Sequence, residues 1–134
     1  MNVFFDLDGT LLDSSERLYR LFCDLVKSNL FSKDDYWKLK RSKIDHKDIL
    51  KSYFPDLSFE EFEQNWLDKI ENSKYLSLDK PFDGVNVLLE ELSKRNNLYL
   101  VTSRQSKKNL NIQLEELGLN KYFKLILVTE HKFK

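Results

Sequence analysis

Three short apolar runs, separated by long stretches with helical periodicity, constrain the fold of this 134-residue chain more than any other feature. They are residues 2–5, 98–101 and 125–128. Each run is continuous rather than alternating, which is typical of strands buried on both faces in a parallel sheet. Glycine and proline are scarce, which disfavours all-β folds with their many tight turns. The sequence therefore predicts an α/β fold built on a Rossmann-like parallel sheet.

The stretch between the first two runs is too long for one crossover connection. Residues 15–75 contain no glycine and one proline, Pro55. Asp13 and Glu16 are spaced like a capping box ahead of an amphipathic helix. Three further positions have the composition of helix starts: Ser32, Asp45 and Ser58. We expect about four helices and no strand in this stretch.

These boundaries divide the chain into a sheet-containing core and an inserted helical cap domain. We expect residues 1–14 and 80–134 to form the core, and residues 15–79 to form the cap. A helix over residues 105–117 is expected to end at Gly118, a natural residue to follow a helix. The core then has the order strand, insert, helix, strand, helix, strand.

Reactive side chains follow the first two predicted strands, and ligands of open parallel sheets bind at the carboxyl ends of strands. Asp6 and Asp8 are two residues apart, so on an extended chain they face the same way. One carboxylate can attack phosphorus and the other can transfer the proton. Gly9 allows a close turn beneath a phosphate, and Thr102 offers it a hydroxyl. Hard oxygen ligands beside phosphate suit Mg²⁺.

An Asp-x-Asp pair taken alone is more often part of a solvated turn. The strand before it, the Gly9-Thr10 pair after it and the Thr102-Ser103 pair at the end of the second strand favour a catalytic site. With these residues in place, residues 3–14 and 98–103 resemble the first and second motifs of the haloacid dehalogenase-like (HAD) hydrolase superfamily. The segment 81–85 resembles the start of the helix that precedes the second motif.

The resemblance covers nearly the whole chain and points to the subclass with a small α-helical cap, which includes phosphoglycolate phosphatase-like and β-phosphoglucomutase-like members. It implies that Asp6 is the nucleophile and Asp8 the general acid and base. It also implies that Asp6 and the backbone carbonyl of Asp8 bind Mg²⁺. The residues expected to bind the phosphate are Leu7, Gly9, Thr10, Thr102, Ser103, Arg104 and Lys134. Lys132 is the alternative to Lys134 as the lysine of the third motif.

The function implied is hydrolysis of a small phosphate monoester through an aspartyl-phosphate intermediate. Two alternatives stay open: a sugar-phosphate mutase of the same family, and a catalytically impaired fragment or binding module. The last arises because the acidic fourth motif has no counterpart before Lys134, so the chain resembles a truncated one. From this we expect weak metal binding. We also expect residues 2–5 to form an open sheet edge prone to self-association.

Composition narrows the remaining possibilities. Basic and acidic residues balance at 22 each, which does not favour a nucleic-acid partner. The single cysteine, Cys23, excludes an internal disulfide and fits a reducing compartment. No signal peptide or membrane span is indicated. We expect a cytoplasmic protein whose partner is a small phosphorylated metabolite.

Several other side chains admit a functional and a simpler interpretation. Arg17 and Arg20 could face the site, although exposed helix charges are the simpler account. Arg104 could contact either the phosphate or the cap. His46 and His131 lack partners at metal-ligand spacing and are predicted to be surface residues. Aromatic residues at helical spacing are predicted to form the core of the cap: Phe59, Phe62 and Trp66.

Overall fold

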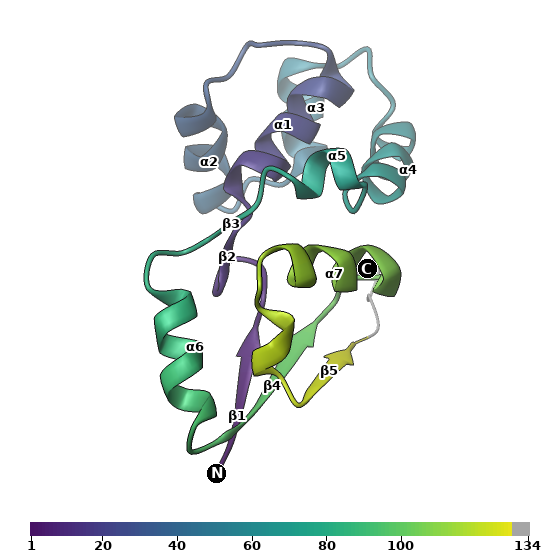
Figure 1. Cartoon of the computed structure of the whole chain (residues 1–134). Helices are drawn as coiled ribbons and strands as arrows, with labels where there is room; N and C mark the ends of the chain where they lie inside the picture. Colours follow the sequence, from purple (N-terminus) through teal and green to yellow (C-terminus); the bar gives the residue numbers. More distant parts are fainter. Residues whose placement is uncertain (130–134) are drawn as a thin grey trace.

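The structure is a computed structural model that describes residues 1–129, and it has two parts joined by a narrow neck (Figure 1). The upper part in Figure 1 is a helical bundle, and the lower part is a sheet with flanking helices. The bundle consists of α1 (Ser15–Val26), α2 (Lys33–Arg41), α3 (His46–Tyr53), α4 (Phe59–Lys69) and α5 (Ser73–Leu76). The lower part consists of β1 (Asn2–Asp6), α6 (Val85–Ser93), β4 (Asn97–Thr102), α7 (Lys107–Glu116), the 3₁₀ turn η1 (Asn120–Tyr122) and β5 (Leu125–Val128). The neck is formed by β2 (Leu12–Asp13) and β3 (Lys80–Pro81).

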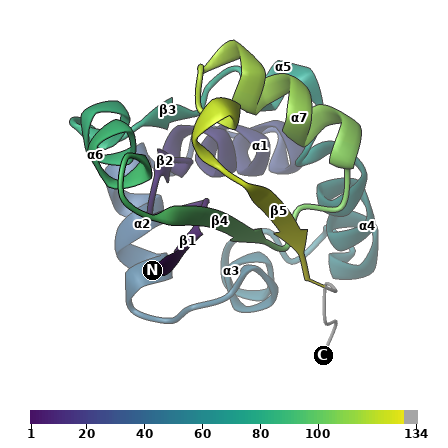
Figure 2. The same ribbon diagram turned by 60° about the horizontal axis from the view of Figure 1, so that its bottom comes forward.

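The three predicted strands form one parallel sheet in the order β1-β4-β5. In register, Asn2 pairs with Asn97, and Tyr99 pairs with Leu125. Both crossovers place their helices, α6 and α7, on the same face of the sheet (Figure 2). This arrangement follows from the right-handed crossover rule when successive strands are added in one direction. The predicted α/β fold class is confirmed.

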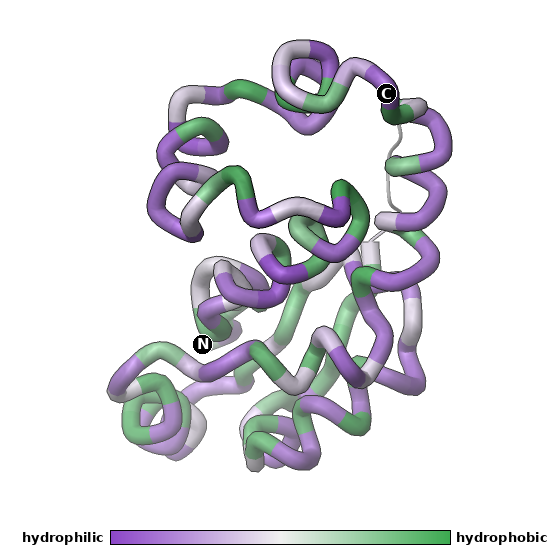
Figure 3. Tube along the Cα trace, turned by 90° about the horizontal axis from the view of Figure 1, so that it is seen from above, coloured by the Kyte–Doolittle hydropathy of each residue, from purple (hydrophilic) through white to green (hydrophobic). Residues whose placement is uncertain are grey.

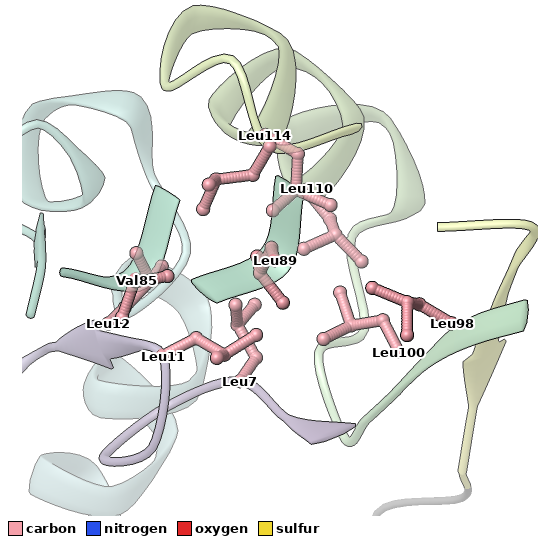
Figure 4. Close-up of a cluster of buried hydrophobic side chains, with 10 residues drawn as sticks. Leu7, Leu11, Leu12, Val85, Leu89, Leu98, Leu100, Leu110 and Leu114 are labelled. Carbon is pink, nitrogen blue, oxygen red and sulfur yellow. The ribbon is translucent and has the colours of Figure 1, made fainter. Parts of the chain in front are cut away.

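The core of the lower part is a cluster of aliphatic side chains between this sheet face and the two helices (Figure 4). Leu98 and Leu100 of β4 are essentially inaccessible to solvent, as expected for alternate residues on the inner face. They meet Leu89 of α6 and Leu110 of α7. The outer face of the sheet has no such cover in the described residues, and Phe4 is 57% exposed there.

Helix starts in the bundle follow the predicted capping residues. The side chains of Ser32, Asp45 and Ser58 each accept a hydrogen bond from the backbone N–H three residues later. The expected capping box of Asp13 and Glu16 does not form. The helix instead begins after Ser14, and the Asp13 carboxylate accepts hydrogen bonds from the N–H and hydroxyl of Ser15 at 3.0 and 2.6 Å. The short helix α5 adds a fifth helix to the four expected.

The bundle has its own core, which is aromatic. Apolar and polar residues alternate in short groups along its helices (Figure 3). Phe22, Tyr36 and Phe62 are buried in a single cluster, with Cys23 and Trp66 partly buried against it. This confirms the interpretation of the Phe59, Phe62 and Trp66 stripe as bundle core.

His46 was expected at the surface, and this prediction is wrong. The imidazole Nε2 and the buried Tyr36 hydroxyl are 2.7 Å apart, and the ring packs 4.6 Å from Trp66. Burial, together with the charge of Lys40, lowers the pKa of His46 to about 3. His46 lies in the first turn of α3, on the side of the helix that packs against the rest of the bundle, so its ring points inward. His131 lies outside the described residues.

Two short strands that the sequence did not indicate form the neck. Leu12 pairs with Pro81 and Asp13 with Lys80 in an antiparallel arrangement. The chain thus leaves the sheet part and returns to it at adjacent points. Within residues 1–129, no helix combines the length and hydrophobicity that crossing a membrane requires.

Candidate active site

The carboxyl ends of β1 and β4 lie side by side, as the topology requires. Asp6, the last residue of β1, aligns with Val101, and Thr102 is one residue further along β4. After Asp6 the chain folds back around the carbonyl of Leu7, which accepts hydrogen bonds from three successive backbone N–H groups at 2.9–3.2 Å. Gly9 has a φ of +81°, a conformation that glycine adopts without strain. The turn places Asp8 beneath the bundle.

The predicted site residues differ sharply in exposure. The Asp6 side chain is exposed, and within residues 1–129 it forms no ion pair. Leu7 is fully buried in the leucine core, so only its backbone can contact a ligand. Thr102 is buried as well, and its hydroxyl accepts a hydrogen bond from the Arg104 backbone N–H at 3.2 Å. Thr10 and Ser103 are exposed. Lys132 and Lys134 lie outside the described residues.

Two arginines and two aspartates form an ion network where the bundle meets the sheet, in which Arg17, Arg104 and Asp79 are buried and the Asp8 side chain is 36% exposed. Arg104 binds both carboxylate oxygens of Asp8, through Nε and Nη2, at 2.8 Å each. Arg17 of α1 donates to Asp8 Oδ1 and to Asp79 Oδ1, both at 2.9 Å. Arg104 also lies 3.3 Å from Asp79 Oδ2. Since Arg17 belongs to the bundle and Arg104 follows β4, this network ties the two parts together.

Neutral groups complete the network. Gln113 of α7 donates to Asp79 Oδ2 at 2.9 Å and accepts from Arg104 Nη1 at 3.0 Å. The Ser14 hydroxyl donates to Asp8 Oδ1 at 2.7 Å. Among the described residues, no buried side-chain nitrogen or oxygen lacks a hydrogen-bond partner. A buried charge network of this kind is tolerated because each group is paired and hydrogen-bonded.

The two carboxylates of the network differ in pKa. Burial alone would raise the pKa of Asp8, but the hydrogen bond and charge of Arg104, with help from Arg17 and Ser14, hold it below its usual value. Burial raises the pKa of Asp79, and the neighbouring Arg17 and Gln113 only partly offset this effect. In this arrangement Asp8 is therefore an ionised carboxylate.

The sequence singled out Asp8, Arg104 and Arg17 but not their pairing with one another. Of the two interpretations of Arg17, the exposed helix charge is wrong, because Arg17 is 2% exposed and lines the cavity at the site; its position four residues before the buried Leu21 was the available signal. Asp79 and Gln113 were not singled out, because nothing local marks a polar residue as the partner of an arginine distant in sequence. Arg104, which was expected to contact either the phosphate or the cap, forms ion pairs with Asp8 and Asp79. The exposed Arg20 matches its expectation and pairs with Glu16 at 3.3 Å.

A cavity of about 1200 Å³ separates the bundle from the carboxyl edge of the sheet. Four predicted site residues line its lower side: Asp8, Gly9, Ser103 and Arg104. Asp6, Leu7, Thr10 and Thr102 are not among the residues that line it. The bundle contributes a wall rich in aromatic side chains. One side of the cavity is thus formed by the motif after β1, and the other side by the aromatic wall of the bundle.

The oxygen ligands at the carboxyl edge of the sheet are few, but they are compatible with a magnesium ion. No group of three or more His, Cys, Asp or Glu side chains within residues 1–129 is arranged to hold a metal. Asp6 offers an exposed carboxylate without a competing cation, and an oxygen ligand of this kind suits Mg²⁺, which retains several waters. The second carboxylate, Asp8, is already paired with two arginines and is available through its backbone carbonyl only.

Comparison with known proteins agrees with the fold described above. Residues 3–134 match the family model of the haloacid dehalogenase-like hydrolases. Among solved structures, a HAD-superfamily hydrolase of subfamily IA, variant 1, from Geobacter sulfurreducens matches with a TM-score of 0.71 at 19% identity, covering 99% of this chain and 64% of that one. No curated protein sequence matches.

Two further structures share the fold. A protein proposed to be a β-phosphoglucomutase, from Thermotoga maritima, matches with a TM-score of 0.63 at 25% identity, covering 95% of this chain and 60% of that one. A protein proposed to be a HAD-type hydrolase, from Bacillus subtilis and solved bound to magnesium, matches with a TM-score of 0.64 at 23% identity, covering 95% of this chain and 62% of that one. The chain spans less than two thirds of the length of each of these three structures.

Proposed function

The chain belongs to the haloacid dehalogenase-like hydrolase family, and we propose that it hydrolyses a small phosphate monoester through an aspartyl-phosphate intermediate on Asp6, with Mg²⁺ as cofactor. The observation that carries this proposal is the contrast between the two motif aspartates. Asp6 is exposed and forms no ion pair within the described residues, whereas Asp8 is held by Arg104 and Arg17. The two carboxylates therefore have separate environments, which suits separate roles.

In the proposed reaction, the Asp6 carboxylate attacks phosphorus and the bond to the ester oxygen breaks. Asp8 gives a proton to the departing oxygen, and in the second half-reaction it takes a proton from the water that attacks the aspartyl phosphate. Bound by Asp6 and the Asp8 carbonyl, Mg²⁺ would neutralise phosphate charge. The Thr102 hydroxyl would orient a phosphoryl oxygen, whereas the N–H groups of Gly9 and Thr10 already donate to carbonyls within the turn.

Arg104 links the resting arrangement to this chemistry. The pair with Arg104 favours the ionised form of Asp8, which is the form needed to activate water. To donate a proton, Asp8 must be protonated, so its contact with Arg104 must loosen in the first half-reaction. A phosphate dianion competes for the same guanidinium, because arginine binds phosphate and carboxylate with similar two-pronged geometry. Substrate binding thus offers a route by which Asp8 is released.

The first prediction tests the nucleophile. Asp6→Asn should abolish phosphate release from p-nitrophenyl phosphate, because an amide cannot form the phosphoryl intermediate. The assay measures free phosphate with and without excess Mg²⁺. Asp56→Asn is the matched control, since Asp56 is an exposed aspartate in the bundle away from the cavity, and this variant should keep the parental rate. Activity that persists in Asp6→Asn would show that another group is the nucleophile.

The mutase alternative is favoured by the likeness to the Thermotoga maritima protein. Product analysis separates the two reactions. Incubation with a sugar phosphate should release free phosphate if the chain is a hydrolase, and should yield an isomeric sugar phosphate if it is a mutase. A chain that does neither with excess Mg²⁺ would instead support the binding-module interpretation.

A further inference from the structure

The wall that the bundle presents to the cavity is aromatic. Trp37 of α2, and Phe59, Phe62 and Trp66 of α4, line it together with His46. Phe62 belongs to the buried bundle core, but Trp37, Phe59 and Trp66 are only partly buried. The most buried aromatic residues of the bundle, Phe22 and Tyr36, do not line the cavity. The lining rings are thus the margin of the core, with part of their surface turned to the cavity.

The two tryptophans are held in defined positions. The Trp37 indole Nε1–H donates to the Ser15 carbonyl at 3.0 Å, which fixes the ring against the start of α1. The Trp66 ring lies 4.6 Å from the His46 ring and 5.9 Å from the Phe62 ring, centroid to centroid. A rigid aromatic surface loses little conformational entropy when a second ring is placed on it. This wall is therefore suited to stacking.

The opposite side of the cavity carries charged side chains, but its arginines and aspartates are paired with one another. Arg17 and Arg104 are both paired with aspartates, so the floor presents no free cation from the ion network. Cations without ion pairs within residues 1–129 lie on the bundle side, where Lys40, Arg41 and Lys47 line the cavity. These cations lie on the same side as the aromatic wall, so they favour entry of an anionic occupant but do not mark the end of the cavity at which its phosphate would react.

The size of the cavity is also informative. Its volume of about 1200 Å³ is above the range of roughly 300–1,000 Å³ that is common for small-molecule sites. A simple sugar phosphate would leave much of this space, and the aromatic wall, in contact with water. An occupant of nucleotide size would reach from the turn after β1 to the rings of α4.

Building on the proposed function, we propose that the phosphate monoester carries a planar aromatic or heteroaromatic ring, which stacks against Trp66 and Trp37 while its phosphate reaches the turn after β1, where Asp8 and Gly9 line the cavity. Nucleoside monophosphates and aryl phosphates share this chemistry. Stacking of a base on an aromatic side chain contributes enough to strengthen binding on the order of tenfold or more. Selectivity for the ring is thus assigned to the bundle, and chemistry to the carboxyl edge of the sheet.

The chain supplies its own reporter for the test. Its only two tryptophans, Trp37 and Trp66, both line the cavity, so ligand stacking should quench the intrinsic fluorescence. Affinities of all probes are measured by isothermal titration calorimetry on the full chain carrying Asp6→Asn, which prevents turnover, in the presence of Mg²⁺, and fluorescence quenching shows whether a ring lies at the tryptophans. The probes are adenosine 5′-monophosphate, 1-naphthyl phosphate and ribose 5-phosphate. At least one of the two ring-bearing phosphates should bind about tenfold more tightly than ribose 5-phosphate.

Variants at the wall decide whether Trp66 is responsible. Trp66→Leu should reduce the preference for the ring to less than about threefold, whereas Trp66→Phe, which keeps a ring, should retain most of it. Tyr53→Leu is the matched control, because Tyr53 is a half-exposed aromatic residue of the bundle that does not line the cavity. Far-UV circular dichroism confirms that each variant is folded.

The outcomes separate this inference from the proposed function. Preference for both ring-bearing probes would identify the ring alone as the determinant, and preference for adenosine 5′-monophosphate only would identify a nucleotide. Equal affinity for all three phosphates, no detectable binding of any, or a preference that survives Trp66→Leu would overturn the inference. Because binding is measured without turnover, a chain that lacks phosphatase activity can still show the preference, and an active one can lack it.

Discussion

Asp79 shows how a single buried side chain can depend on distant partners. Its carboxylate is inaccessible to solvent and touches Arg17 of the bundle, together with Arg104 and Gln113 of the sheet part. The two arginines and the two aspartates of the network have no net charge together. Removing the Asp79 charge therefore leaves two buried arginines that share one carboxylate, Asp8, which is more costly than losing an exposed ion pair.

Replacing this carboxylate tests that argument. Asp79→Asn should lower the free energy of unfolding by about 1–3 kcal/mol, the cost of disrupting buried hydrogen bonds, measured by urea denaturation. Glu91→Gln removes one member of the exposed Lys94–Glu91 pair at 3.1 Å and should change stability by less than about 1 kcal/mol. If Asp79→Asn is no more destabilising than Glu91→Gln, the buried network does not stabilise the contact between bundle and sheet.

His46 leads to a prediction about pH. Its pKa is lowered to about 3 from an ordinary 6.5, so the unfolded chain binds a proton at higher pH than the folded chain does. Stability should therefore be complete above about pH 7 and decline as the pH falls from 6.5 towards 3. The linkage relation gives a loss of about 2 kcal/mol between pH 7 and pH 5.

A variant isolates the histidine contribution. His46→Gln cannot titrate, so it should be less stable than the parent at pH 7 but should lose little further stability on acidification to pH 5. Thermal or urea unfolding at the two pH values provides the comparison. A pH dependence that is the same in the variant and the parent would mean that other groups, such as Asp45 and Lys40 nearby, cause it.

At the scale of elements, the sequence predicted what is encoded locally. The three strands were located to within a residue because each is a continuous apolar run, and the starts of α2, α3 and α4 because Ser32, Asp45 and Ser58 act within one turn. The neck was missed because two-residue strands have no periodicity. The pairings within the ion network were missed because they join residues 62 and 96 positions apart.

The end of α7 provides a test at this scale. Gly118 was predicted to follow the helix, and it does so with a φ of +69°, in a turn where the Gly118 N–H bonds to the Glu115 carbonyl and the Leu119 N–H to the Leu114 carbonyl. Gly118→Ala should cost about 1 kcal/mol. The cost is entirely one of backbone conformation, because a Cβ at this position would meet no atom within 4 Å.

Asparagine is the control for this position, since it tolerates left-handed backbone conformations better than alanine. Gly118→Asn should therefore be more stable than Gly118→Ala in urea denaturation. Equal stability of the alanine variant and the parent would indicate that α7 ends differently in solution.

At the scale of the whole molecule, the sheet is covered on one face only within residues 1–129. Its outer face carries Phe4 and Leu125, which are 57% and 53% exposed, and Phe4 stacks on Tyr99 at 4.9 Å. β1 also lies at the edge of the sheet. Exposed apolar surface next to an unpaired edge favours association between chains. We therefore propose that the chain self-associates through β1 and the neighbouring outer face.

Light scattering on a size-exclusion column should show an apparent mass that rises with protein concentration. Phe4→Lys should shift the chain towards the monomer, because it places a charge in the middle of this surface. Val87→Lys is the matched control, since Val87 is a 68% exposed apolar residue on α6, and it should leave the association unchanged. A parent chain that stays monomeric at all concentrations would rule out the proposal.

The neck of β2 and β3 bears on the order in which the chain folds. Asn2 and Asn97, which meet across β1 and β4, are 95 residues apart in sequence, and closing so long a loop is entropically costly. The bundle between them is held by contacts that close shorter loops, such as those of α1 with α2 and with α4, and such contacts form sooner. Once it has formed, the neck leaves roughly a third of the original loop to be closed, which saves about 1 kcal/mol of closure entropy. The insert that we assign to ligand selection is thus expected also to act as the template on which the parallel sheet assembles.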